Sequence, residues 1–167
     1  MQLIVLRQSG ELTISPAPVS ELLLDAKAAC AEQLRLRGLT LTIENDMDTL
    51  EMERDLLSDL LVNLIDNAGK ASRPGDTIAL IARGGAISVI DHGIGVAEDE
   101  LDRLTQPFYM VDKSRTRKAG GAGLGLALCD EIARLHGARL EFKSAPGSGT
   151  TVSVVFGAEG ARDEKNV

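Results

Sequence analysis

NLIDNAGKAS, residues 63–72, puts two amides and an ammonium into a segment that is otherwise rich in leucine. Asn63, Asn67 and Lys70 recur at i, i+4 and i+7, so in a helix they lie on one face. They flank an apolar stripe that predicts a core helix over 52–72. The members of that stripe are Leu56, Leu57, Leu60, Leu61, Leu64, Ile65 and Ala68. Amide oxygens suit a hard cation such as Mg²⁺ and an ammonium suits a phosphate, but a polar rim on a core helix would carry the same residues.

The segments on either side predict an α+β fold. Helical spacing predicts further long helices over 18–38 and 123–137, each closed by a glycine, and a short helix near 98–104. Alternating runs bounded by turn residues predict strands, the last four of them paired as two hairpins. These strands are 39–45, 76–83, 86–91, 138–144 and 150–156. Mostly antiparallel strands with three long helices and no regular βαβ alternation predict a two-layer α/β sandwich.

Composition limits the possible classes of protein. The chain has 167 residues, 44% hydrophobic and 26% charged, which is typical of one soluble domain. Aromatic residues are only 2%, so we expect an aliphatic core. A net charge of −7 argues against a nucleic-acid or anionic-membrane surface. Without a long apolar run or a signal peptide, we expect a cytoplasmic chain with no direct membrane contact. Cys30 and Cys129 lack metal spacing and are predicted to be buried thiols.

Asp91 is the first residue after a predicted strand, in the stretch IDHGIGV (90–96). A carboxylate in this position could accept a hydrogen bond from an exocyclic amine such as that of adenine. Gly93 and Gly95 supply backbone that a ligand can approach closely. An ordinary glycine-containing turn is the alternative interpretation.

Glycines also recur where a loop enters the last predicted helix, in the stretch GGAGLGLAL (120–128). Backbone N–H groups at a helix N-terminus favour phosphate, although a flexible loop before a core helix explains the same glycines. No G-K-[ST] follows, so this is not a Walker motif. Just before it, DKSRTRK (112–118) indicates either a phosphate lid or a solvated loop. Its basic residues are Lys113, Arg115, Arg117 and Lys118.

In order and spacing, these stretches resemble the motifs of the catalytic ATP-binding domain of bacterial sensor histidine kinases, in the superfamily that includes gyrase-type ATPases and heat-shock chaperones. NLIDNAGKAS resembles the N box, DHGIG the first glycine box, PFYMVDKSR the F box, GGAGLGLAL the second glycine box and GSGT the last. The resemblance extends from about residue 19 to residue 156. It implies a mixed, mostly antiparallel sheet packed on three helices (the Bergerat fold), with ATP and Mg²⁺ as cofactors.

The resemblance also implies a role for each motif residue. Asn67 is expected to bind Mg²⁺ with Asn63 beside it, and Lys70 to contact phosphate. Asp91 is expected to accept from the adenine amine, together with Thr150 and a water. The remaining ATP contacts that it implies are Gly93 and Gly95 at the base, Phe108 and Tyr109 at the hinge of a lid, Lys113 and Arg115 on that lid, and Gly121, Gly123, Leu124 and Gly125 around the phosphates; Lys70 and Arg115 are the catalytic cations.

Two positions depart from related sequences in ways that bear on catalysis. Met110 stands where family members commonly carry Arg, so we assign the γ-phosphate contact to Arg115, with Lys113 or Arg117 in reserve. Asn63 stands where the gyrase-type branch has a Glu that activates water. Because an amide cannot act as a general base, we expect the chain to hold ATP without hydrolysing it efficiently.

The sequence has two histidines, and we predict that both are structural. His92 lies in the first glycine box, where Asn or Thr is common, and His136 precedes a helix-ending glycine with no carboxylate after it. The stretch LIVLRQSGELTISPAPVSELL (3–23) resembles the end of a dimerisation helix and its linker. The predicted organisation is therefore 1–17 for that helix end and linker, 18–157 for the catalytic ATP-binding domain and 158–167 for a C-terminal tail.

These features predict the catalytic domain of a sensor histidine kinase, which presents Mg-ATP for phosphoryl transfer to a histidine outside this chain. The expected partners are the dimerisation domain of the same kinase and, through the full-length kinase, a response regulator. One alternative is a free-standing anti-sigma-type serine kinase, against which the N-terminal leader argues. The other is a nucleotide-binding scaffold without catalysis, against which the intact glycine boxes argue.

Overall fold

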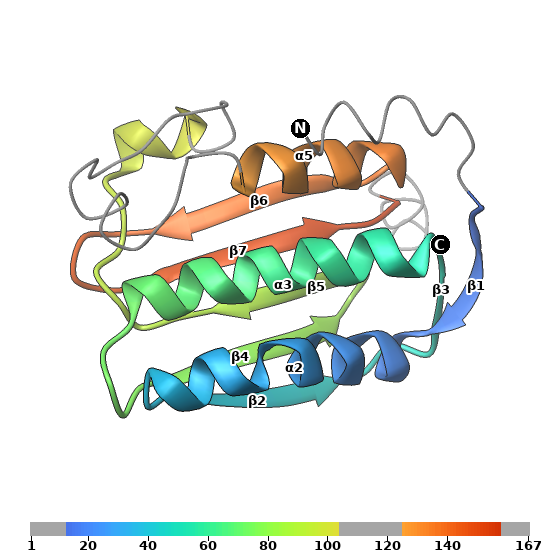
Figure 1. Ribbon diagram of the computed structural model, residues 1–167. Helices are drawn as coiled ribbons and strands as arrows, with labels where there is room; N and C mark the ends of the chain where they lie inside the picture. The colour runs from blue at the N-terminus through green and yellow to red at the C-terminus, as the bar shows by residue number, and fades with distance from the viewer. Residues whose placement is uncertain (1–12, 104–124, 158–167) are drawn as a thin grey trace.

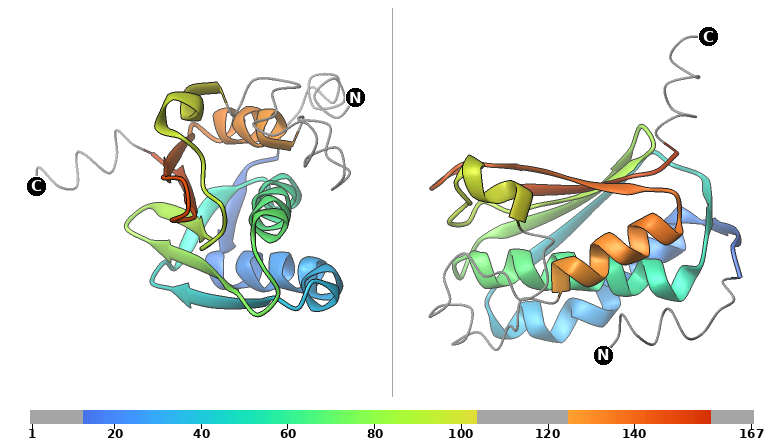
Figure 2. Two further views of the ribbon diagram at one scale, coloured as in Figure 1. Left: turned by 90° about the vertical axis from the view of Figure 1, so that its left-hand side faces the viewer. Right: turned by 90° about the horizontal axis from the view of Figure 1, so that it is seen from above.

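The computed structural model describes residues 13–103 and 125–157, which form a two-layer sandwich (Figure 1). A five-stranded sheet has the order β2-β4-β5-β7-β6. Helices α2, α3 and α5 cover one face of this sheet, as the view from above in Figure 2 shows. The elements are β1 (Ser15–Pro18), α2 (Val19–Leu36), β2 (Thr40–Asn45), β3 (Thr49–Met52), α3 (Arg54–Ala71), β4 (Thr77–Arg83), β5 (Ala86–Ile90), the 3₁₀ helix η1 (Glu98–Arg103), α5 (Gly125–Leu135), β6 (Arg139–Ser144) and β7 (Thr150–Val155).

The sheet is mixed, as the resemblance implies. β2 runs parallel to β4, while β4–β5, β5–β7 and β7–β6 are antiparallel. The parallel pair is joined through α3, because parallel neighbours need a crossover connection. β4 and β5 form a tight hairpin through Gly84 and Gly85, whose φ angles of 60° and 77° suit a two-residue turn that matches the strand twist.

Alternation along the strands sends one set of side chains towards the helices. In β4, Ile78, Leu80 and Ala82 are buried, while the residues between them face away from the helices. The buried strand residues pack on α3, the central helix, which contacts both α2 and α5. The α3 side chains in this core are Leu57, Leu60, Leu61, Leu64 and Ile65. Burial of each such leucine contributes about 1.5–3 kcal/mol, so an aliphatic core suffices without tryptophan.

Both cysteines are buried and free, as predicted. Burial, and then the nearby charge of Asp66, raise the pKa of Cys30 to about 11. Burial also raises the pKa of Cys129, whose Sγ donates to the Leu60 carbonyl oxygen at 3.5 Å. Both thiols therefore stay protonated at neutral pH.

The predicted long helices agree with α2, α3 and α5 to within two residues at each end. α3 begins at Arg54 because the Glu53 side chain accepts a hydrogen bond from the Leu56 N–H at 2.9 Å and so caps the helix. Gly38 and Gly137 follow the ends of α2 and α5 with φ angles of 71° and 66°, in the left-handed region that glycine tolerates. The short helix predicted near 98–104 is a 3₁₀ helix.

A two-stranded sheet formed by β1 and β3 was not predicted from the sequence. Ser15 pairs with Met52 and Pro18 with Thr49, so β1 crosses the predicted boundary between 17 and 18. The predicted N-terminal leader up to residue 12 and the tail 158–167 lie outside the described residues. Within the described residues, none of the helices combines the length and apolar character needed to cross a bilayer.

Candidate functional site

One end of the sandwich joins segments that are far apart in the sequence. At the left of Figure 1 lie the last turn of α3, the loop after β5 and the turn between β6 and β7, while α5 begins nearer the middle of the picture. The Asp91 N–H donates to the Thr150 carbonyl oxygen at 2.9 Å, and the Gly147 N–H donates to that of Ile94 at 2.7 Å. The Ile94 N–H in turn donates to the Ala71 carbonyl oxygen at 3.3 Å, at the end of α3. The N box, the first glycine box and the last glycine box thus meet at one end of the sheet.

Among the described residues, Asp91 is the one charged residue that is buried, with 6% of its surface exposed. Its Oδ1 accepts hydrogen bonds from the Gly93 N–H at 2.9 Å and the Thr150 N–H at 3.2 Å. No hydrogen bond from residues 13–103 or 125–157 reaches Oδ2. Burial raises the pKa of Asp91, although the two hydrogen bonds and then His92 lower it. Oδ2 keeps some accessible surface, because no fully buried side-chain oxygen among the described residues lacks a hydrogen-bond partner, and it is therefore open to a donor group on a ligand.

The glycines around Asp91 are required by packing within the protein. A Cβ at Gly93 would overlap the carbonyl oxygen of Ala71, and a Cβ at Gly95 would overlap that of Ala145. Gly149 lies equally close to the Asp91 carbonyl oxygen, with a φ of 84°. From the sequence we expect Gly93 and Gly95 to let a ligand approach the backbone closely. In the structure, the space beside these glycines is taken by the end of α3 and by the β6–β7 turn.

On α3, Asn63 is oriented by its own helix. Its Nδ2 donates to the Asp59 carbonyl oxygen at 2.9 Å, one turn earlier. Its Oδ1 lies 3.6 Å from the position that a Cβ on Gly125 would occupy, so this oxygen faces the start of α5. Asn67 is half-buried one turn later, and no side-chain hydrogen bond links it to another described residue.

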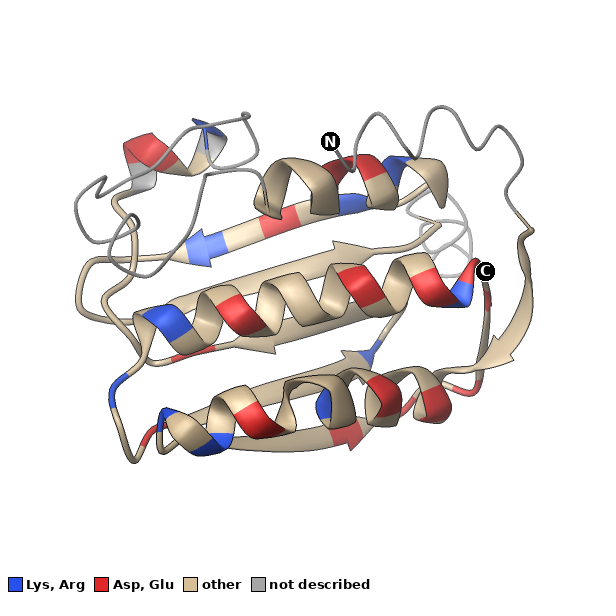
Figure 3. Ribbon diagram, in the orientation of Figure 1, with Lys and Arg blue, Asp and Glu red and all other residues tan. Residues whose placement is uncertain are grey.

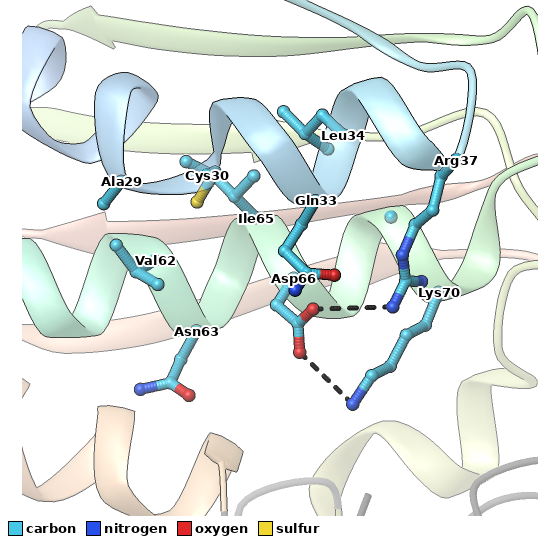
Figure 4. A pocket seen from close by; sticks show the side chains of 11 residues that line it. Ala29, Cys30, Gln33, Leu34, Arg37, Val62, Asn63, Ile65, Asp66 and Lys70 are labelled. Carbon is cyan, nitrogen blue, oxygen red and sulfur yellow. Dashed lines mark ion pairs between the residues drawn. The ribbon is translucent and has the colours of Figure 1, made fainter. Parts of the chain in front are cut away.

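Lys70 is the basic residue in the last turn of α3. Figure 3 shows acidic residues along the helix before this turn. Its Nζ is 3.2 Å from Asp66 Oδ2, and Asp66 Oδ1 is 3.8 Å from Arg37 Nη2. Figure 4 shows Asp66 between these two cations, while Asn63 and Lys70 extend from α3 away from α2. Asp66 therefore holds Lys70 at the edge of the site.

A hollow of about 320 Å³ lies between α2 and α3 (Figure 4). It shares Asn63 and Lys70 with the predicted site but includes neither Asp91 nor Thr150. The hollow is lined by Ala29, Cys30, Gln33, Leu34, Arg37, Val62, Asn63, Ile65, Asp66, Gly69 and Lys70. The candidate site therefore lies on the other side of α3, facing α5 and the loop after β5.

A hydroxyl that sequence reasoning missed lies beside Thr150. Ser144, the last residue of β6, has its Oγ 2.7 Å from the Val96 nitrogen, 2.9 Å from the Gly149 carbonyl oxygen and 2.8 Å from Thr150 Oγ1. The only signal in the sequence was a serine at an inward-facing strand position directly before the hairpin turn.

Neither histidine is hydrogen-bonded to Asp91. His136 Nε2 accepts from the Glu53 N–H at 2.9 Å, so Nδ1 carries the proton and donates to the Ile132 carbonyl oxygen at 2.8 Å. Both nitrogens of His136 are therefore used by backbone, in agreement with the predicted structural role. His92 is exposed in the loop after β5.

Several predicted site residues lie outside the described part of the chain. They are Phe108, Tyr109, Met110, Lys113, Arg115, Arg117, Gly121, Gly123 and Leu124. Gly125 is described and is the first residue of α5. The structure thus places Lys70, Asp91 and Thr150 at one end of the sandwich, and Asn63, near the middle of α3, opposite Gly125 at the start of α5.

A mixed sheet covered on one face by three helices, with a buried carboxylate at a strand end and an amide-bearing helix beside it, defines a two-layer class of α+β sandwich. A family model described as "Histidine kinase-, DNA gyrase B-, and HSP90-like ATPase" matches residues 52–159, and the chain belongs to this family. This match confirms the resemblance found in the sequence. The roles of individual residues stay predictions.

Among curated relatives, sensor histidine kinase YkoH of Bacillus subtilis is 38% identical over 137 residues, which is 78% of this chain and 30% of YkoH. Sensor protein SrrB of Staphylococcus aureus (strain MRSA252) is 36% identical over 141 residues, 80% of this chain and 24% of SrrB. The chain thus spans less than a third of the length of these relatives.

Solved structures agree with the fold. Full-length ShkA in complex with AMPPNP superposes with a TM-score of 0.74 and 25% identity over 86% of this chain and 31% of ShkA. The catalytic domain of histidine kinase ThkA, nucleotide-free, superposes with a TM-score of 0.71 and 19% identity over 86% of this chain and 95% of that domain. The predicted α+β class, a mixed and mostly antiparallel sheet on three helices, is confirmed.

Proposed function

We propose that this chain binds Mg-ATP and presents it for transfer of the γ-phosphoryl group to a histidine on a dimerisation domain outside this chain. In that reaction a histidine nitrogen attacks the γ-phosphorus, the bond to the bridging oxygen breaks, and ADP leaves. The observation that carries the proposal is the buried Asp91 carboxylate, in a chain of the ATPase family, whose Oδ2 accepts nothing from the described residues. We place this domain in the cytoplasm, with the dimerisation domain and a response regulator as its partners in two-component signalling.

The base end of the site is assigned to Asp91 and Thr150. Oδ1 is held by two backbone N–H groups, which leaves Oδ2 to accept from the exocyclic amine of adenine. A guanine or hypoxanthine would present a carbonyl oxygen there, and two acceptors repel. The Thr150 hydroxyl and a water complete the contacts to the base.

The phosphate end is assigned to the rim of α3. Asn63 Nδ2 donates a hydrogen bond to the Asp59 carbonyl oxygen. This leaves Oδ1, a neutral oxygen that can coordinate a hard cation, facing the site. With Asn67 this gives two amide oxygens, a donor set that fits Mg²⁺, which usually keeps waters and phosphate oxygens as its other ligands. When bound, Mg²⁺ would neutralise charge on the phosphates. Lys70, held at the rim by Asp66, adds a cation that the phosphates can reach, and the start of α5 adds backbone N–H groups.

The same residues argue against hydrolysis. Asn63 cannot take a proton from water, because an amide is not a base at neutral pH. Asp66, the carboxylate four residues before Lys70, is in ion pairs with Lys70 and Arg37. His136 is unsuited as a phosphoacceptor, because both of its nitrogens are hydrogen-bonded to backbone atoms. The proposed reaction therefore needs a histidine from another domain.

Calorimetry tests the binding part of the proposal. ATP and ADP should bind in the presence of Mg²⁺, and Asn67→Ala should weaken Mg-ATP binding by about tenfold or more, which is roughly 1.4 kcal/mol. Unchanged binding by this variant would remove Asn67 from the site. Asp46→Asn, an exposed change far from the site, is the matched control.

Incubation with γ-labelled ATP tests the catalytic part. The chain alone should neither label itself nor release phosphate appreciably, and a matching dimerisation domain should acquire an acid-labile, base-stable label. Transfer in trans should be weak, because no tether raises the effective concentration of the histidine. Acid-stable phosphoserine on a partner would instead favour an anti-sigma-type kinase, and rapid phosphate release would contradict the reading of Asn63.

A further inference from the structure

Three strand ends place three polar side chains on the helix-facing side of the sheet. Asp91 follows β5, Thr150 begins β7 and Ser144 ends β6, and these strands are neighbours in the order β5-β7-β6. Ser144 and Thr150 are directly paired in the β6–β7 ladder. Ser144 is half-buried. Its Oγ is in hydrogen-bond contact with the Val96 N–H, the Gly149 carbonyl oxygen and Thr150 Oγ1.

Counting protons assigns a direction to each of these contacts. A serine hydroxyl has one proton and two lone pairs. The Val96 N–H can only donate and the Gly149 carbonyl oxygen can only accept, so Ser144 accepts from Val96 and gives its proton to Gly149. The contact with Thr150 is then satisfied only if the Thr150 hydroxyl donates to Ser144. This is the one arrangement that satisfies all three contacts, and networks that leave a member unpaired are costly.

We propose that Ser144 is a positioning residue of the base site: it holds the Thr150 hydroxyl proton, so that Thr150 turns only lone pairs towards a bound base. The inference rests on the proposed function, because it concerns how the site selects its nucleotide. Thr150 Oγ1 and Asp91 Oδ2 then form a pocket made of acceptors. An amine at position 6 of the purine can donate into such a pocket, whereas a carbonyl at that position finds no donor.

Ser144 has a second effect through the same oxygen. By accepting from Val96 and donating to Gly149, it ties the loop after β5 to the β6–β7 turn. These are the two segments that carry Asp91 and Thr150, and the Gly149 backbone lies directly against the Asp91 carbonyl. Loss of the hydroxyl would leave the Val96 N–H without this acceptor, and it would free the Thr150 proton to turn towards a ligand.

The experiment compares ATP with inosine triphosphate, which carries a carbonyl in place of the adenine amine and is otherwise closely similar. Ser144→Ala should reduce the preference for ATP over inosine triphosphate by roughly three- to tenfold, the range expected for one hydrogen bond. Ser144→Thr keeps the hydroxyl in a strand position that tolerates β-branching and should restore the preference. Ser144→Cys, with a weak donor, should shift it in the same direction as alanine and serves if the alanine variant does not fold.

A matched control exists on the neighbouring strand β7, which also carries Thr150. Ser153 Oγ lies 2.7 Å from Ser88 Oγ across β5 and β7, on the face of the sheet away from the helices. Ser153→Ala removes a comparable hydroxyl contact and should leave the nucleotide preference unchanged. Thr150→Val should itself reduce the preference, and adding Ser144→Ala to it should then leave the preference unchanged, because Ser144 sets the preference through Thr150. Loss of the tie between the two loops should weaken the binding of ATP and inosine triphosphate alike.

Two results would overturn the inference alone. One is an equal loss of affinity for ATP and inosine triphosphate in Ser144→Ala, which a purely structural role would produce. The other is a full effect of Ser144→Ala in the Thr150→Val background. If the unaltered chain binds neither nucleotide, the proposed function fails and this inference fails with it, so the two failures are distinguishable.

Discussion

Asp91→Asn should weaken ATP binding and, at the same time, stabilise the nucleotide-free protein. The two backbone N–H groups that donate to Oδ1 require an acceptor in that position. An asparagine can meet this requirement only with its carbonyl oxygen, so its NH₂ group must take the place of Oδ2. That group would face the adenine amine as donor against donor, and we expect ATP affinity to fall by about tenfold or more.

The gain in stability follows from the buried charge. Burial is the main influence on Asp91 and raises its pKa despite the two hydrogen bonds, so the ionised form is less favourable in the folded chain than in the unfolded chain. Asparagine keeps both acceptor contacts and removes the charge. Single stabilising substitutions commonly raise the free energy of unfolding by about 0.5–2 kcal/mol, and we expect a gain in this range at pH 7.

The pH dependence has a definite sign. Because the folded-state pKa of Asp91 lies above its ordinary value of 3.8, the stabilising contribution of the protonated group is complete below 3.8 and is lost as the pH rises through the folded-state pKa. The difference in unfolding free energy between Asp91→Asn and the unaltered chain should therefore be small at pH 3. It should grow as the pH rises and become constant above the folded-state pKa.

Urea unfolding of the nucleotide-free proteins from pH 3 to pH 8, with calorimetry of ATP binding at pH 7, measures both effects. Asp46→Asn is the control, because Asp46 is 69% exposed and paired with Arg83 at 3.3 Å, and surface changes of this kind stay within about 0.5 kcal/mol. A destabilised Asp91→Asn at pH 7 would refute the reasoning about the buried charge. Unchanged ATP affinity would refute the assignment of Oδ2 to the base.

Three further substitutions test the packing of the site by urea unfolding. Gly93→Ala should destabilise by about 1–3 kcal/mol, because its Cβ would overlap the Ala71 carbonyl oxygen; a neutral result would mean that the loop can move aside. Gly69→Ala should stabilise by up to about 1 kcal/mol, because this glycine is inside α3 and its new Cβ would meet its nearest neighbours at an ordinary 3.6 Å; a loss of stability would contradict this. His136→Ala should cost about 1–3 kcal/mol by leaving the Glu53 N–H unpaired, and a loss below 0.5 kcal/mol would show that water replaces the imidazole.

Much of the fold could be predicted because its signals are local. The apolar stripe of α3 and the closing glycines Gly38 and Gly137 marked the helices to within two residues, and alternation marked the five strands of the main sheet. β1 and β3 were missed because each has only four residues, and β1 contains two prolines, which usually argue against a strand. Short strands depend on the partner that pairs with them, and that partner is more than thirty residues away here.

The sequence predicts a set of candidate site residues, whose roles stay predictions, but it does not predict the contacts among them. Asn63, Lys70 and Asp91 were identified from spacing and from position after a strand. Gly93 was expected to let a ligand approach, and that role stays a prediction; its close contact with Ala71, at the end of α3, was not predicted, because no local pattern reveals such a contact. Ser144 was missed for the same reason, since its importance arises from atoms contributed by two separate loops.

Both ends of α3 are held by contacts with other segments of the proposed nucleotide site or next to it. At its start, the Glu53 N–H is bound by His136, which lies just beyond the end of α5. At its end, the Ala71 carbonyl oxygen accepts from Ile94 and packs against Gly93, in the loop that carries Asp91. These contacts are about 27 Å apart along an 18-residue helix, so they fix its position and its direction. In the proposed site, the polar residues of α3 face the same ligand as Asp91 and the start of α5. Small displacements of positioned groups are costly, so α3 must not tilt relative to those two groups. The glycine that sequence patterns associate with a ligand and the histidine that looks incidental therefore serve one physical purpose, which is to hold the amide rim of α3 in register with Asp91 and with the start of α5.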